Sequence, residues 1–272
     1  MSKKKKKVLI KIIIAIVILC LFGIGSVNFT ELGRDIIYEL TGINIDKYLN
    51  SNKIKTESPK SDSKYEVTLN KCVDGDTVSF NLDGEVIKVR FLGIDTPETK
   101  HPSKGEEPYG KEASEYTCKR LTNAKKIEIE YESNIARYDD YDRSLVWVYV
   151  DGTLLQEKLI EKGYAKVRYL YASYLYTDNL YKKQTSAQKS KLGIFEDYSS
   201  DCKVKDTYTV TFKVSKKIVD KVEVDNCSLV KIPDNPVKEG YRFVGWKKGS
   251  SLFDLSDKID SNITLKASFK KE

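Results

Sequence analysis

The clearest pattern of apolar and polar positions predicts a β-hairpin over residues 76–92. In residues 78–82, and again in residues 87–91, every second side chain is apolar and those between are polar or charged. Such alternation is typical of strands with one buried and one exposed face. Asp83-Gly84, between the two runs, is a favoured sequence for a two-residue hairpin turn. We therefore expect two antiparallel, half-buried strands that pair Thr77 with Arg90.

This register brings acidic residues together at the open end of the hairpin. Asp76 would face Phe91, and Asp95 follows shortly afterwards, beside the corner Asp74-Gly75-Asp76. Repulsion among these carboxylates and Glu98 would destabilise a purely structural hairpin. A divalent cation relieves that repulsion, and hard oxygen ligands on loops suit calcium. The alternative is that two polar turns merely share one edge of a sheet.

The start of the chain has the pattern of a membrane segment. The apolar run Val8–Ile24 is interrupted only by Lys11, and as a helix it spans ~26 Å, near the lower limit for a bilayer. Lys3–Lys7, which precede the run, would keep that end in the cytoplasm. We expect a single-pass cell-membrane protein, anchored by residues 1–27, with the rest of the chain outside the cell. Cleavage of a signal peptide near Gly23-Ile-Gly25, followed by secretion, is the alternative.

The remaining sequence indicates three further regions. Residues 28–63 combine an amphipathic stretch, which predicts a juxtamembrane helix, with a polar stretch that predicts a flexible linker. The residue pattern changes again after about residue 205, where short runs typical of β-strands begin. We therefore expect two folded domains, over residues 64–200 and 206–271. The four cysteines beyond the anchor are isolated in sequence, and we expect buried or unpaired thiols.

Charge and histidine content limit the possible chemistry. The net charge of +7 derives largely from six lysines in the first 27 residues, and residues 64–200 carry 21 basic and 23 acidic residues. Long-range attraction to a polyanion is therefore weak, and any nucleic-acid chemistry depends on local groups. The chain has one histidine, His101, which argues against a histidine-based catalytic or metal site.

Four motifs in residues 64–198 resemble the thermonuclease (staphylococcal nuclease-like) family. They are Asp95-Thr-Pro-Glu-Thr-Lys-His-Pro102, Tyr109-Gly-Lys-Glu-Ala113, Tyr141-Asp-Arg-Ser-Leu145 and Gly163-Tyr-Ala-Lys-Val167. The resemblance implies an α+β fold, with an OB-fold five-stranded barrel that carries three helices. Strands fit near residues 65–72, 76–82, 86–92, 126–132 and 144–150, and helices fit near residues 109–122, 153–162 and 176–190.

The resemblance also implies a role for individual residues. The catalytic residues would be Glu98, as general base, and two arginines that grip the scissile phosphate, Arg90 and Arg143. Calcium would be held by Asp76, Asp95 and the carbonyl of Thr96. The substrate-binding residues would be Tyr169, Tyr171 and Tyr141, since aromatic faces can stack on any base. Arginine suits phosphate because its planar fork donates two hydrogen bonds and stays charged.

The loop around the second arginine departs from the family pattern. Asp142 and Ser144 stand where the family often has glycines, and Asp140 stands where a lysine is found. We expect Asp142, next to Arg143, to hold the guanidinium away from substrate until calcium and phosphate arrive.

The C-terminal region resembles the Listeria–Bacteroides repeat, an internalin B-repeat-like β-grasp module of Gram-positive surface proteins. The run that carries this resemblance is Pro236-Val-Lys-Glu-Gly-Tyr-Arg-Phe-Val-Gly-Trp246. The run lacks a set of acids, histidines or nucleophiles, so we expect Phe243 and Trp246 in the core. The module would be a spacer or an adhesion module with a cell-surface or wall ligand.

Together these observations predict a monomeric, calcium-dependent endonuclease, tethered at the cell surface, that hydrolyses extracellular DNA and RNA to 3′-phosphate products. The alternative is a catalytically weak nucleic-acid-binding or adhesion protein that uses the OB barrel and the C-terminal repeat.

Overall fold

The computed structural model describes residues 54–99, 105–133, 135–198, 206–225 and 228–271. The expected membrane anchor and juxtamembrane helix lie outside these residues. Among the residues described, no helix is both long and apolar enough to cross a membrane. From Lys55 onward the chain forms one compact unit.

Five strands close into a barrel in the order β4-β3-β2-β6-β7, because β4 also pairs with β7. They are β2 (Ser61–Cys72), β3 (Thr77–Leu82), β4 (Glu85–Phe91), β6 (Ile127–Glu132) and β7 (Ser144–Val150). The first half of β2 pairs with β6 and the second half with β3, with a register shift between Leu69 and Lys71. Such irregularities let one strand bend around a barrel. The predicted five-stranded barrel is therefore confirmed.

The predicted hairpin is confirmed in its register but not in its burial. Thr77 pairs with Arg90, and the amide of Phe91 donates to the carbonyl of Asp76 over 2.9 Å. Thr77 and Ser79, expected on an exposed face, are only 8% and 9% exposed. The alternation therefore predicted the strand correctly but not the burial of its polar face.

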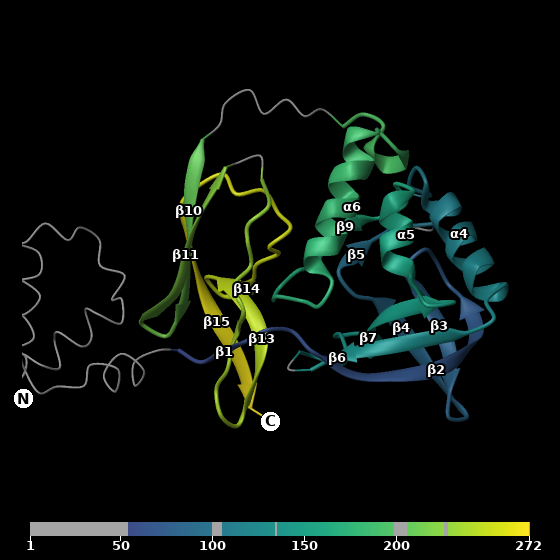
Figure 1. Ribbon diagram of the computed structural model, residues 1–272, viewed down its shortest axis with the longest axis horizontal. Coiled ribbons are helices and arrows are strands. Elements are labelled where there is room, and N and C mark those ends of the chain that lie inside the picture. The colour runs from purple at the N-terminus through teal and green to yellow at the C-terminus, as the bar shows by residue number, and fades with distance from the viewer. Residues whose placement is uncertain (1–53, 100–104, 134, 199–205, 226–227, 272) are drawn as a thin grey trace, which may run out of the picture. The chain divides into compact units, whose positions relative to one another are not determined.

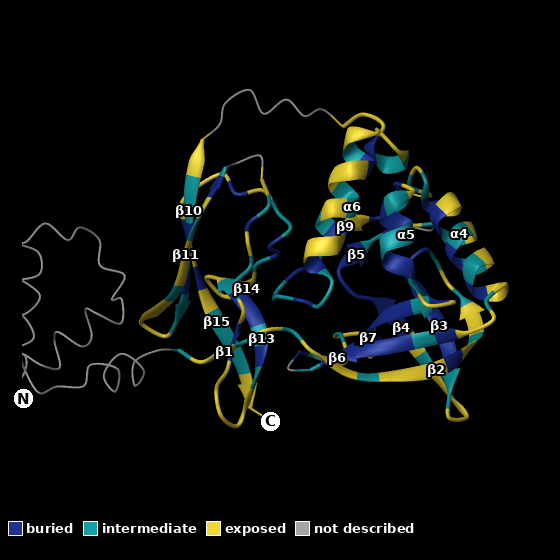
Figure 2. Cartoon of the chain, in the orientation of Figure 1, coloured by how far each residue is buried: buried dark blue, intermediate teal, exposed yellow. Residues whose placement is uncertain are grey.

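Three helices lie side by side against the barrel strands (Figure 1), as the resemblance implied. They are α4 (Gly110–Thr122), α5 (Leu155–Glu161) and α6 (Thr177–Lys189). Figure 2 shows buried residues along β3 and β7, whereas α4 and α6 have exposed outer faces. Short elements complete this part of the chain: β5 (Ile94–Asp95) pairs with β9 (Lys166–Val167), β8 (Thr153–Leu154) pairs with β7, and η1 (Gly193–Phe195) follows α6.

A disulfide joins the end of β2 to α4. It links Cys72 and Cys118, which are 46 residues apart in sequence. The expectation that the cysteines are unpaired thiols is wrong for this pair. Isolated spacings along the chain gave no sign of the pairing, because the barrel and the helix meet only in three dimensions. The bond fixes α4 beside the corner that carries Asp76.

The end of the expected flexible linker is paired rather than free. Strand β1 (Thr56–Glu57) pairs antiparallel with β12 (Asn235–Pro236), and Ser61 already belongs to β2, where it pairs with Glu132. The polar composition suggested a linker, but a polar segment can form a strand when a partner strand is available at an edge. Residues 54–63 therefore join the two folded parts of the chain.

The C-terminal residues form a five-stranded mixed sheet in the order β11-β10-β15-β13-β14. Its strands are β10 (Thr207–Val214), β11 (Lys217–Asp225), β13 (Tyr241–Lys248), β14 (Ser251–Leu252) and β15 (Ile263–Lys271). Phe243 and Trp246 are 3% and 0% exposed, which confirms that they belong to the core. No helix occurs in residues 206–225 and 228–271.

Candidate active site

The corner before β3 is a tight turn that positions Asp76. One oxygen of Asp74 accepts hydrogen bonds from the amides of Asp76 and Thr77, over 3.0 and 2.7 Å, a common way for aspartate to stabilise a turn. Gly75 allows the turn to approach its neighbours closely: a Cβ there would lie 2.7 Å from Oγ1 of Thr96. The local sequence therefore brings Asp76 against the loop that follows β5.

The Asp76 carboxylate is buried and shares one oxygen among three donors. It is 5% exposed, and its Oδ2 accepts from the amide and hydroxyl of Thr96, over 2.7 and 3.0 Å. Nη1 of Arg90 is 3.0 Å from the same oxygen. Burial raises the pKa of Asp76, although the Arg90 charge opposes the rise, and the negative charge of Asp74 adds to it.

Arg90 connects the two aspartates. Its Nη2 donates to Oδ1 of Asp95 over 3.2 Å, while Nη1 also donates to the carbonyls of Ile94 and Phe91. At 9% exposure, the residue is not the ordinary exposed strand arginine that its alternation with apolar residues allowed. Both terminal nitrogens of Arg90 already have hydrogen-bond partners. Its main role in this structure is therefore to neutralise the charge of Asp76 and Asp95.

Asp95 is held by a short strand pair that the sequence did not reveal. Asp95 on β5 is opposite Lys166 on β9, and Nζ of Lys166 is 3.5 Å from its Oδ2. Burial raises the pKa of Asp95; Arg90 and Lys166 lower it, and Asp76 raises it. Arg90, Asp76 and Lys166, whose charges shift the pKa of Asp95, are therefore all its neighbours in this site.

Glu98 lies near this pair on an exposed segment. Its amide donates to a carboxylate oxygen of Glu107 over 3.0 Å, and its carbonyl lies so close to Gly110 that a Cβ there would be 2.7 Å away. Burial raises the pKa of Glu98, with further increases from Asp76 and Asp95. The three carboxylates predicted to gather therefore do sense one another's charge.

The carboxylates of Asp76 and Asp95 have oxygens that suit a hard cation such as calcium. Oδ1 of Asp76 has one partner, the Thr77 hydroxyl at 3.2 Å, and Oδ2 of Asp95 has Lys166 at 3.5 Å. Carboxylate oxygens are ligands that calcium prefers, and each of these two has a single partner among the described residues. Within the described part of the chain, however, no three His, Cys, Asp or Glu side chains are close enough to form a metal group.

Arg143 differs from Arg90 in how it is held. Its Nε donates to Oδ2 of Asp139 over 2.7 Å, and neither terminal nitrogen has a hydrogen bond to any residue that the structure describes. Burial would raise the pKa of Asp139, but hydrogen bonds from Arg143 and from the Tyr141 amide outweigh burial and lower it. Arg143 is therefore held through Nε, while its two terminal nitrogens, which form the fork of the guanidinium, are free of the described residues.

The expectation that Asp142 restrains Arg143 is wrong. The carboxylate on the guanidinium is Asp139, whose other oxygen also accepts from the amides of Tyr141 and Arg143, both over 2.9 Å. Asp142 instead occupies a left-handed backbone conformation, with φ of 61°. This conformation is the physical reason that a glycine suits the position.

A cleft of about 340 Å³ lies between the two arginines. It is lined by both arginines, by the three predicted substrate tyrosines and by Leu252 of the C-terminal sheet. Tyr141 is 79% exposed and Tyr169 is 44% exposed. The Arg90 guanidinium is 5.6 Å from the centre of the Tyr169 ring, and that of Arg143 is 5.4 Å from Tyr141. Cations, hydrogen-bond donors and aromatic faces therefore share one opening.

An OB-type barrel with an acidic corner, a free arginine fork and an aromatic cleft defines a nuclease-type domain. Sequence comparisons agree. Residues 88–197 match the family described as staphylococcal nuclease homologue, and residues 208–268 match the Listeria-Bacteroides repeat domain. The thermonuclease of Staphylococcus hyicus is 36% identical over 127 residues, which are 47% of this chain and 73% of that protein. The chain belongs to the staphylococcal nuclease family.

Two Bacillus subtilis (strain 168) proteins are also similar. The SPbeta prophage-derived endonuclease YokF is 43% identical over 131 residues, 48% of this chain and 44% of that protein. Endonuclease YncB is 40% identical over 130 residues, 47% of this chain and 61% of that protein. The chain thus spans about half the length of these two relatives.

Sequence reasoning missed three residues of the site. Lys166 stands in one quoted motif and Asp139 lies two residues before another, so their positions marked them as candidates but did not show which residues they contact. Leu252 had no such signal, since it belongs to the C-terminal sheet and reaches the cleft only through the tertiary fold.

Proposed function

We propose that this protein is a calcium-dependent endonuclease that hydrolyses phosphodiester bonds of DNA and RNA and leaves 3′-phosphate ends. The observation that carries the proposal is the cleft itself. Arg90, which bridges Asp76 and Asp95, lines the cleft, and Arg143 lines it beside Tyr141 with both terminal nitrogens free of the described residues. Phosphodiester hydrolysis requires both charge neutralisation and substrate positioning in one place.

Each residue has a role that follows from its contacts. Asp76, Asp95 and the carbonyl of Thr96 would hold calcium, whose charge would offset the negative charge that builds up on the phosphoryl oxygens. Glu98, which is exposed near both aspartates, would accept the proton of the attacking water.

The two arginines divide the remaining work. Arg143 would donate two parallel hydrogen bonds to the phosphate from its terminal nitrogens. Arg90 would keep the aspartates in position and add positive charge beneath the phosphate. Tyr169 and Tyr171, whose ring centres are 6.5 Å apart, would bind the nucleotide through their faces.

We also propose that the protein acts at the cell surface, held by its N-terminal apolar segment. The Cys72–Cys118 disulfide supports export, because such bonds persist in oxidising compartments. Protease treatment of intact cells tests the location: loss of cell-associated nuclease activity supports it, and full protection contradicts it.

The direct test of the activity uses the full chain with single-stranded DNA and, separately, RNA. We expect hydrolysis with calcium, none with excess chelator, and product ends from which a phosphatase releases phosphate. Activity that persists in chelator would contradict the calcium role.

A catalytically weak nucleic-acid-binding protein is the second candidate. Arg90 favours it, since both of its terminal nitrogens already have partners. Binding of an oligonucleotide without cleavage at any calcium concentration would support this candidate.

A further inference from the structure

The tyrosine loop, residues 168–173, has most of its backbone hydrogen bonds with the C-terminal module. The Asp254 carboxylate accepts from the amides of Tyr169 and Leu170, over 2.7 and 3.0 Å. Three more contacts follow along the loop: Leu255 N donates to Leu170 O, Trp246 N donates to Tyr171 O, and the Asn235 side chain bonds both N and O of Ser173. Buried backbone groups need partners, and this loop finds them outside the barrel.

Asp254 is built into this contact. It is 8% exposed, it also accepts from the amide and hydroxyl of Ser256, and Arg168 lies 3.5 Å away as a countercharge. Tyr169 has φ of 60°, a conformation that is unfavourable for residues with a side chain. The amides of Tyr169 and Leu170 donate to this buried carboxylate, and these two hydrogen bonds hold that conformation and so fix where the Tyr169 ring lies.

The sheet of the module approaches the loop too closely for a side chain. A Cβ at Gly245 would lie 2.7 Å from the carbonyl oxygen of Tyr171 and 3.1 Å from the Leu252 side chain. The backbone there has φ of 143°, within the range that glycine accepts readily. Gly245 therefore lets β13 pack directly on Tyr171 and brings Leu252 beside it.

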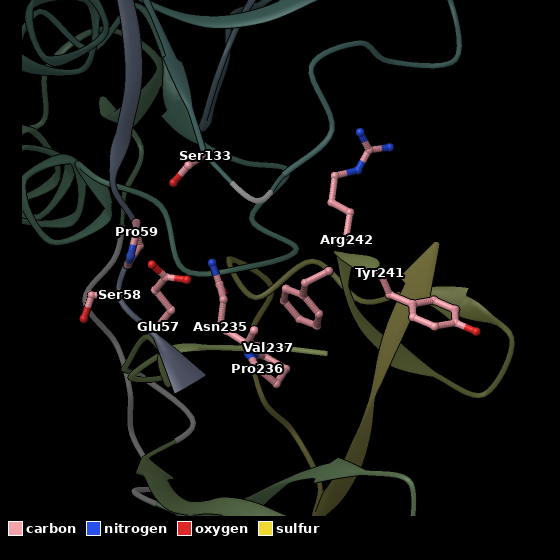
Figure 3. Close-up of a pocket in the computed structure, with 10 residues that line it drawn as sticks. Glu57, Ser58, Pro59, Ser133, Asn235, Pro236, Val237, Tyr241 and Arg242 are labelled. Carbon is pink, nitrogen blue, oxygen red and sulfur yellow. The ribbon is translucent and has the colours of Figure 1, made fainter. Parts of the chain in front are cut away.

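A second junction lies away from the cleft. Figure 3 shows Glu57, Ser58 and Pro59 on one side of a small pocket and Asn235, Pro236 and Val237 on the other. The β1–β12 pairing crosses this junction. The module is thus joined to the barrel both here and at the tyrosine loop, as expected if their contact is a fixed part of the protein.

Leu252 is the point at which the module enters the substrate site. It is 37% exposed and lines the cleft together with Tyr171, Tyr169 and Arg143. An apolar side chain beside aromatic faces favours an unpaired base over a phosphate.

We propose that the Listeria-Bacteroides repeat completes the nucleotide-binding site: Asp254 positions the tyrosine loop, and Leu252 contacts the bound nucleotide. The assignment rests on the proposed function. It replaces the idea of a separate spacer or adhesion module with that of a module that determines how the enzyme binds its substrate.

The test measures kcat and KM of the full chain on a single-stranded oligonucleotide. Asp254→Asn places an amide group against a backbone amide and should raise KM about tenfold, the scale of one lost base stack, with a smaller change in kcat. Asp260→Asn is the matched control, because Asp260 is exposed on the same module and the charge change is the same. Its KM should equal that of the wild type.

Leu252→Glu tests the direct contact and decides the question if Asp254→Asn fails to fold. A carboxylate facing the phosphates should raise KM about fivefold or more. Ile218→Glu, at a 57% exposed position of the same module, should have no effect. If the Leu252 and Asp254 variants both match their controls, the assignment is overturned while the nuclease function stands.

Failure of the proposed function gives a different result. If the wild-type chain does not cleave, the dissociation constant of the intact oligonucleotide replaces KM for the same four variants. Weaker binding by Asp254→Asn or Leu252→Glu, with the two control variants unchanged, would still support the role of the module. Equal binding by all four variants would overturn it.

Discussion

Replacing Arg143 with lysine tests whether the free guanidinium fork is what binds phosphate. Arg143 uses Nε to bind Asp139, so its two terminal nitrogens can both serve the substrate. Lysine keeps the charge but has one ammonium group, and Asp139 would compete for it. Of two charge-assisted bonds to phosphate, at most one remains. At ~1.5–3 kcal/mol for a lost bond, we expect a rate decrease of roughly 10- to 150-fold.

The assay is the initial rate of oligonucleotide cleavage at saturating calcium, with thermal unfolding measured in parallel. Arg143 is partly exposed, so the unfolding temperature should not change. Arg137→Lys is the matched control, since that arginine belongs to the same segment but pairs with Asp62. Full activity of Arg143→Lys, within about threefold of wild type, would refute the reasoning.

A double variant separates the two causes of the loss. Asp139→Asn keeps one carbonyl oxygen for the loop amides but removes the charge that captures the lysine. Added to Arg143→Lys, it should recover part of the activity. No recovery would mean that the missing fork, and not capture by Asp139, accounts for the whole effect.

Three further changes have defined outcomes. Asp142→Gly should alter the calcium requirement by less than about fivefold, since an exposed charge that is not paired with Arg143 contributes ~1 kcal/mol at most; a larger shift would restore Asp142 as a restraint. Burial raises the pKa of Glu132 to about 8, so the folded state binds a proton that the unfolded state releases above pH 4.5, and stability is lost as pH rises towards 8. Glu132→Gln should flatten this dependence in urea unfolding, and an unchanged pH profile would exclude Glu132 as its source. Cys118→Ser should lower the free energy of unfolding by up to about 4 kcal/mol, because the disulfide closes a loop of 46 residues. Reductant should destabilise the wild type by the same amount and leave the variant unchanged. Equal stability of the wild type and Cys118→Ser without reductant would show that the disulfide is not formed.

The local parts of the fold could be predicted from the sequence. Period-two alternation and the turn at Asp83-Gly84 gave the hairpin and its register, because both depend on residues a few positions apart. They also placed Asp76 and Asp95 at one edge. The same pattern misjudged the burial of Thr77 and Ser79, since alternation depends on neighbours along the strand and not on what packs over its second face.

The long-range contacts could not be predicted. The pairing of Asp95 with Lys166 requires β5 and β9 to meet, and the choice of Asp139 over Asp142 depends on the backbone conformation of one turn. The disulfide and the Asp254 contact join segments that no local pattern connects. Each needs the tertiary fold, because the partners lie 46 and about 85 residues apart.

The calcium dependence of the initial rate, compared between the wild type and Asp95→Asn, tests the central claim most directly. Loss of the negative charge of this ligand should raise the calcium concentration for half-maximal rate by about 10-fold or more, since even outer-shell partners of a metal contribute on that scale, with part of the rate recovered at saturating calcium. Asp83→Asn, in the exposed hairpin turn, removes the same charge and should leave the curve unchanged. If Asp95→Asn also leaves the half-maximal calcium concentration unchanged, the aspartate pair does not hold calcium and the account of the active site is wrong.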